Sequence, residues 1–201
     1  MKNKNYIDDK AREFLAQVRE NLDADSQMVL DQNQLVFEDA DFYLRKNIKA
    51  ASGTLDLIQR SDSEKTGTRN IDRSELPSLQ NLILKGLVLS YAVGGASTTD
   101  PAVVSYSSKK PSTAVPALQN GELIIEQDDK PVLQIPVERF FSAADSDEAF
   151  SEKEAIWLDN WRLIKAQRPF KVKIKFAEGQ AVSDANTFVS VHLLGTKTRK
   201  R

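Results

Sequence analysis

Cysteine is absent from the 201-residue chain, and histidine occurs once, as His192. Without cysteine the chain has no disulfides, thiolate metal sites or cysteine nucleophiles. One histidine leaves little room for histidine-based metal binding or acid–base catalysis. A long apolar run is also missing, because the most apolar window, Leu82–Val93, is interrupted by Lys85 and Ser90. A membrane-spanning helix needs about 20 apolar residues, so we expect none.

An excess of charge of either sign is missing as well. Lys and Arg number 28 and Asp and Glu 29, which gives a formal net charge of −1. This balance argues against a globally basic nucleic-acid binder and against an acidic disordered protein. The N-terminal residues are charged every few positions and contain no signal-peptide core, so we expect synthesis in the cytoplasm without export.

The charges are nevertheless segregated along the chain. Residues 120–160 carry 11 acidic and 3 basic side chains, whereas residues 168–201 carry 8 basic and 2 acidic ones. Two interpretations are open. The segments are two solvated faces, or they place opposite charges against a neighbouring copy of the chain.

Residues 6–22 have the pattern of an amphipathic helix, with apolar side chains at three- and four-residue spacing. The polar residues 23–33 that follow read as a linker, so we predict a helical arm and linker over 1–33. The helix either covers its own domain or packs on a neighbouring subunit. For the second alternative the predicted interface residues are Ile7, Phe14, Leu15, Val18 and Leu22.

From residue 34 to 196 the sequence predicts a mainly β domain, an antiparallel β-sandwich or jelly roll, because short apolar segments alternate with turn-forming residues. The clearest strand is 170–176, FKVKIKF, in which apolar residues and lysines occupy opposite faces. Asp128 and Asp129 separate two apolar runs and suggest a hairpin. The predicted strands are 34–38, 42–48, 53–58, 80–93, 102–106, 122–126, 131–137, 161–166, 170–176 and 187–194.

A short helical insertion is predicted between residues 138 and 160. Ser151 and Glu154 have the spacing of a capping box before Ile156 and Trp157. Trp157 and Trp161 are four residues apart, and they are core residues, interface residues or a platform for stacking sugars.

Motifs that carry chemistry are missing. The chain has no phosphate-binding glycine loop, no HExxH and no GxSxG. His192 lies in a strand pattern, TFVSVHLLG, where a structural role is the commoner one. The acidic residues at 128–129 and 145–154 are read as solvated, with weak calcium binding or a glycosidase pair as alternatives. We therefore predict no catalytic, cofactor or metal site and no small-molecule substrate.

The chain ends in a basic tail, predicted over 197–201. Short basic tails can contact phosphate groups or acidic lipid headgroups. The candidates for such contact with a genome or a membrane are Lys197, Arg199, Lys200 and Arg201.

Two blocks of the sequence resemble capsid proteins of small tailless icosahedral bacteriophages. The first contains LVFEDADFYLRKNI, SGTLDLI and ELPSLQNLILKGLVLSY, and the second contains IPVERFF, RLIKAQRPFKVKIKF and TFVSVHLLGTKTR. The likeness covers most of residues 34–199 and is one of layout. It is greatest to jelly-roll capsid proteins of phages that infect Bacteroidetes-type hosts, including lipid-containing phages. At 201 residues the chain is too short for two jelly rolls in tandem, which favours a single one, or a minor virion protein.

This resemblance implies a structural virion protein that is no enzyme and that assembles with copies of itself and with other virion proteins. Weak contact of the basic C-terminus with packaged nucleic acid or internal lipid is part of the same expectation. The alternative function is a carbohydrate-binding or adhesion β-sandwich that uses both tryptophans, and it requires the two indoles to be exposed on one surface.

Overall fold

The computed structural model describes residues 4–107, 116–141, 155–183 and 185–201, with residues 4–7 described by their backbone alone. Two helices, α1 (Lys4–Gln17) and α2 (Ala24–Asp31), precede the strands. The strands are β1 (Leu35–Asn47), β2 (Thr54–Asp56), β3 (Leu82–Val93), β4 (Glu122–Gln127), β5 (Lys130–Pro136), β6 (Ile156–Ile164), β7 (Phe170–Lys175) and β8 (Thr187–Lys200). Short helices connect some of them: η1 (Arg19–Asn21), η2 (Pro101–Val103), α3 (Pro116–Gln119) and η3 (Val137–Phe140). None of the helices in this described part is long and apolar enough to cross a membrane.

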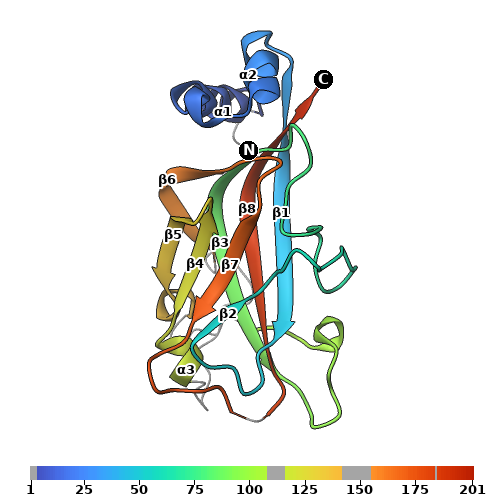
Figure 1. The fold of residues 1–201 in the computed structure, drawn as a ribbon, viewed down its shortest axis with the longest axis vertical. Coiled ribbons are helices and arrows are strands. Elements are labelled where there is room, and N and C mark those ends of the chain that lie inside the picture. The colour runs from blue at the N-terminus through green and yellow to red at the C-terminus, as the bar shows by residue number, and fades with distance from the viewer. Residues whose placement is uncertain (1–3, 108–115, 142–154, 184) are drawn as a thin grey trace.

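The strands form an antiparallel β-sandwich of two four-stranded sheets. Each strand of the first half pairs with one of the second half: β1 with β8, β2 with β7, β3 with β6 and β4 with β5. The chain is thus one long hairpin that folds over, so that successive strand pairs lie alternately in the first and in the second sheet. The first sheet has the order β1-β8-β3-β6 and the second the order β2-β7-β4-β5. Figure 1 shows α1 and α2 across the end of the sandwich where both ends of the described chain lie.

The alternation in FKVKIKF is confirmed. Phe170, Val172, Ile174 and Phe176 are buried between the sheets, while the lysines between them face outward. The hairpin at Asp128 and Asp129 is confirmed as well, because these two residues join β4 and β5. Both have positive φ, 55° and 57°, as the two central residues of a type I′ turn require.

Residues 34–38 and 42–48 are one strand and not two. β1 pairs with β8 without interruption from Leu35 to Asn47. The intervening Asp39-Ala40-Asp41 continues the alternation, with Ala40 buried and both aspartates exposed. Ala40 between two aspartates therefore maintains the alternation of a strand. The sequence did not predict a strand there because this stretch has so little apolar character.

The predicted strand 102–106 is wrong, because residues 101–103 form η2 and only Ser107 bridges to Tyr91. The loop packs on the outer face of the first sheet through Tyr106, whose hydroxyl donates to the Pro101 carbonyl at 2.8 Å. The Arg45 guanidinium lies between the rings of Tyr43 and Tyr106, 5.1 and 5.0 Å from their centroids. Burial raises the pKa of Tyr106 to about 12.

The linker prediction for residues 23–33 is wrong, because Ala24–Asp31 is helix α2. Asp23 caps it by accepting a hydrogen bond from the Ser26 amide at 2.9 Å. Val29 and Leu30 are buried against the sheet, and Asn33, with φ of 56°, ends the helical stretch in the left-handed region. The polar composition of the segment concealed a capped helix with one apolar edge.

The helical insertion is also corrected in part. Residues 137–140 form the short helix η3, but Ile156 and Trp157 begin strand β6. Ser151 and Glu154 lie outside the described residues. The predicted strand 161–166 covers only the second half of β6.

Strands β3 and β8 approach each other closely at Gly195, where their register shifts by one residue at a β-bulge between Leu84 and Gly86. A Cβ atom at Gly195 would collide with the backbone carbonyl oxygen of Ile83. Because the obstacle is backbone in the centre of the sheet, no side-chain rotation relieves it. Glycine is therefore required here by close approach and not by its dihedral angles.

We expect Gly195→Ala to lower the free energy of unfolding by about 1–3 kcal/mol, since the added methyl group forces β3 and β8 apart. Chemical denaturation followed by circular dichroism measures this loss. Gly95→Ala is the matched control, because a Cβ there meets only Thr98 Oγ1 at 3.8 Å, an ordinary contact. Equal stability of the two variants would contradict the assigned bulge.

Candidate interaction surface

The predicted helical stripe packs on its own domain, although α1 itself ends at Gln17. Leu15 of α1 and Leu22, directly after η1, are buried in a second core cluster, outside the sandwich, together with Phe37 and Ile83 of the first sheet. Phe14 and Val18 pack partly buried against this cluster, and the Ile7 side chain lies outside the description. Of the two alternatives, the structure thus shows the helix covering its own sheet. The predicted interface is corrected accordingly, since Leu15 and Leu22 have almost no exposed surface to offer a neighbour.

Trp161 holds α1 on the sheet from the side of β6. Its ring meets the Phe14 ring edge-on, with centroids 5.9 Å apart. The Lys85 ammonium group lies 4.6 Å from the indole centroid and donates to Thr196 Oγ1 at 2.6 Å. Burial lowers the pKa of Lys85 from its ordinary value of 10.5. Trp161 is therefore part of the packing between helix and sheet.

Trp157 lies on the same outer face of β6 but is exposed over 59% of its surface. It packs against Gly86, where a Cβ atom would come within 2.8 Å of the indole. The two tryptophans therefore do not form the joint exposed platform that the sugar-binding alternative requires. Trp157 is instead a single exposed indole that packs on Gly86.

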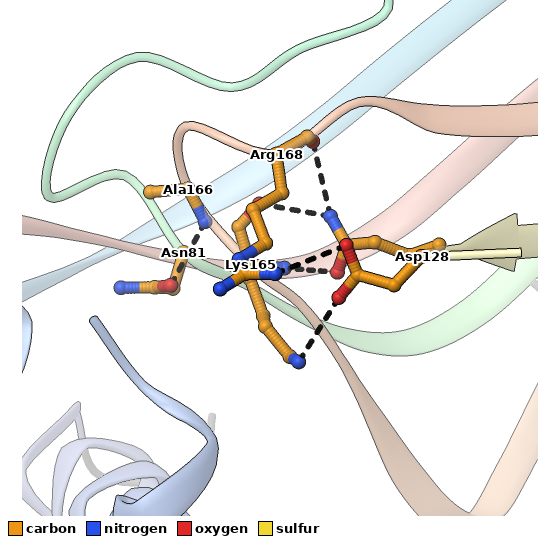
Figure 2. A network of polar contacts seen from close by, with 6 residues as sticks. Asn81, Asp128, Lys165, Ala166 and Arg168 are labelled. Carbon is orange, nitrogen blue, oxygen red and sulfur yellow. Dashed lines mark hydrogen bonds and ion pairs between the residues drawn. The ribbon is translucent and has the colours of Figure 1, made fainter. Parts of the chain in front are cut away.

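A buried asparagine, Asn81, joins the helical layer to the sandwich. Its Nδ2 donates to Ser26 Oγ of α2 at 2.9 Å, and its Oδ1 accepts from the Ala166 amide at 3.0 Å. Figure 2 shows Asn81 facing Ala166 in the turn between β6 and β7. The backbone N–H of Asn81 donates to Thr198 Oγ1, and the backbone N–H of Thr198 donates to the backbone carbonyl of Asn81. One side chain and its backbone thus tie together three separate parts of the chain.

Gln127 and Asp128 join the turns β4–β5 and β6–β7. Figure 2 shows Asp128 facing Lys165 and Arg168. Gln127 Nε2 donates to the carbonyls of Lys165 and Arg168, both at 3.1 Å, and its Oε1 accepts from the Lys165 amide. Asp128 pairs with Lys165 Nζ at 3.4 Å and Arg168 Nη1 at 3.2 Å. Partial desolvation raises the pKa of Asp128, but hydrogen bonds from Arg168 and Lys165 outweigh it and hold the pKa below 3.8.

The acidic and basic segments meet within one chain. Asp129 pairs with Lys171 at 3.1 Å and Glu126 with Lys173 at 2.6 Å, because β4 and β7 are neighbours in the second sheet. Part of the charge segregation along the sequence is therefore neutralised by strand pairing. These described pairs do not need a neighbouring copy.

The basic tail is part of strand β8, which extends to Lys200 opposite Leu35. The buried Thr196 and Thr198 alternate with the bases and give the segment a strand pattern. Lys197 and Arg199 both pair with Glu38, at 3.6 and 2.6 Å. Lys200 and Arg201, the other two predicted contact residues, are exposed, and neither pairs with a carboxylate of the described residues.

His192 lies on the outer face of β8, and its Nδ1 is 2.8 Å from Asp41 Oδ1 of β1. Its ring lies 5.9 Å from that of Tyr43. Ser190, two residues away, is buried with its hydroxyl unpartnered, so it makes no hydrogen bond to the histidine. Within the described ranges, no three His, Cys, Asp or Glu residues are grouped as metal ligands.

Sequence patterns did not single out Asn81, Lys85 or Arg12 as important. Arg12 stacks over Phe37, with its guanidinium carbon 5.3 Å from the ring centroid. The partners of these three residues come from distant parts of the chain, so a local pattern does not reveal them. Comparison of the chain with family models, with curated proteins and with solved structures finds no match.

Asn81→Ala is expected to lower the free energy of unfolding by about 1–3 kcal/mol or more, because the Ala166 amide loses its buried partner. Thermal denaturation measures the loss. Asn160→Ala, at an exposed position of β6, is the control and should be nearly neutral. An unchanged midpoint for Asn81→Ala would contradict its role as the tie between layers.

Asp128→Asn is expected to cost about 1 kcal/mol or less at pH 7, since the carboxylate is more than one third exposed. The pKa of Asp128 is lower in the folded chain, so its ion pairs stabilise the fold above pH 3.8 and are lost as the pH falls further. The difference between wild type and variant should therefore shrink in acid. Urea denaturation at pH 7, 5 and 3 tests this, with the exposed Asp159→Asn as control.

Proposed function

We propose that this chain is a self-assembling structural subunit of the virion of a small tailless icosahedral bacteriophage, built on a single jelly roll. The observation that carries the proposal is the pairing of β1 with β8, β2 with β7, β3 with β6 and β4 with β5. Eight strands in two sheets are the layout of jelly rolls, which recur in viral capsid and lectin domains. The likeness in sequence layout to capsid proteins points to the first of these.

The distribution of buried and exposed groups supports a structural role. The interior between the sheets is filled by apolar side chains, which makes the sandwich a rigid block. The Asp41–His192 pair contacts Tyr43 and links neighbouring strands. The functional proposal rests on a fold-level analogy and is therefore tested by assembly and not by an activity assay.

Trp157 is the residue we propose for contact between copies. It is the largest of the exposed apolar side chains in the described chain, the others being Met28, Val93 and Val103. Tryptophan is enriched among the residues that dominate binding energy, and the indole of Trp157 packs directly over Gly86.

The sugar-binding alternative retains one observation in its favour, the exposed indole of Trp157. With Trp161 packed between Phe14 and Lys85, a sugar ring would stack on one tryptophan only. We therefore place assembly first.

Light scattering and negative-stain electron microscopy of the purified chain test the proposal, and a homogeneous large particle is the expected result. Trp157→Ala should reduce the yield of particles at least severalfold with little change in the thermal midpoint. Met28→Ala, at an exposed position of α2, is the matched control and should assemble as the wild type. A chain that stays monomeric over all concentrations and salts would overturn the proposed function.

A further inference from the structure

A polar pocket of about 270 Å³ lies where α1, the turn before β1 and the end of β8 meet. Its lining includes Arg12, Arg201 and Asn33. Asp8 is the acidic residue of the lining. The lining residues therefore carry two positive charges and one negative charge, and they have more hydrogen-bond donors than acceptors. This favours a ligand with a single negative charge.

Arg12 is held in place by two contacts. Its guanidinium lies on the Phe37 ring, and Nη2 donates to the Leu35 carbonyl at 3.4 Å. Nη1 is buried and has no hydrogen-bond partner among the residues that the structure describes. A guanidinium has five N–H donors in a fixed plane, a geometry that matches carboxylate and phosphate oxygens. The orientation of the group is thus set before any ligand binds.

The edge of β1 adds a backbone donor to the same place. Along this strand the Leu35 carbonyl and the amides of Tyr43 and Arg45 point away from β8, since their hydrogen-bond partners are Arg12, Asn70 and Thr68. Backbone groups alternate in direction along a strand, so the Phe37 amide points to this edge as well. Phe37 lines the pocket, and by this alternation its amide is not paired with β8.

We propose that this pocket binds one phosphodiester group of a nucleic acid, an inference that rests on the proposed virion function. A phosphodiester carries one negative charge, which the pair of arginines against Asp8 balances. The exposed Asn33 of the lining and the exposed Lys200, next to Arg201 in sequence, are both polar. A site for a membrane surface would be flanked by apolar side chains that enter the interface, and these two positions offer none.

Fluorescence anisotropy of a labelled single-stranded oligonucleotide, titrated with the full chain between 50 and 200 mM salt, tests the proposal. Arg12→Gln should weaken binding about tenfold, because charge-assisted hydrogen bonds to the phosphate are lost. Removing one phosphate contact should also reduce the slope of log K against log salt by about 0.7. Arg19→Gln is the matched control, because Arg19 is exposed nearby, pairs with Asp31 and does not line the pocket.

Arg201→Gln provides a second test that leaves the packing of α1 on Phe37 intact, and thermal midpoints of all variants show whether they are folded. If Arg12→Gln unfolds, Arg201→Gln decides by the same two criteria. Binding and salt slope equal to those of Arg19→Gln overturn the proposal. Loss of binding to phosphatidylglycerol vesicles, with oligonucleotide binding unchanged, overturns it in favour of a membrane. Particle size in the same samples reports separately on the proposed function, which fails only if the wild type does not assemble.

Discussion

Strand β8 is the element on which the first sheet depends. It is the only strand of that sheet that contacts β1, and it pairs with β3 on its other side from Thr187 to Lys197. Its interior face supplies Val189, Val191 and Leu193 to the core between the sheets. Strand β1 therefore has no partner strand until β8, the last strand of the chain, has formed. Contacts of this sequence separation are slow to form because loop closure costs entropy before pairing offsets it.

The same strand determines where the N-terminal helices lie. Beyond Gly195, β8 continues past the sandwich interior, and Thr198 meets Asn81 and the Leu79 carbonyl there. Asn81 in turn contacts Ser26, so α2 is positioned by the C-terminal end of the chain. The helical layer then covers apolar residues of the first sheet, Leu35, Phe37 and Ile83, that would otherwise face water. Burial of this second cluster explains why α1 remains on its own domain instead of extending as a free arm.

Local patterns predicted those features that a few neighbouring residues determine. FKVKIKF predicted β7 because strict alternation has one structural solution, and Asp128-Asp129 predicted the hairpin because both positions tolerate positive φ. The capped helix α2 was within reach of the same reasoning, since Asp23 precedes it and Val29 and Leu30 follow about two turns later. The surface on which α1 packs could not be predicted in this way, because its apolar stripe fits a neighbouring subunit as well as its own sheet. The choice depends on Ile83 and Trp161, far away in sequence, so only the tertiary structure decides it.

The charges of the chain follow from this topology. A hairpin folded over itself places the acidic strand β4 beside the basic strand β7, and Lys173 and Lys171 find carboxylates there. In the same way Lys197 and Arg199 reach Glu38 across the β1–β8 ladder.

Groups that strand pairing has already satisfied offer little to another molecule, because a new contact must replace an existing one. Residues left outside these ladders are therefore the better candidates for intermolecular contact. The exposed indole of Trp157 on the edge strand β6 is such a group. Trp157 and Arg12, the residues on which the two proposals rest, lie on different elements of the first sheet and its helical cover, so each proposal can be tested by a mutation that leaves the other residue in place.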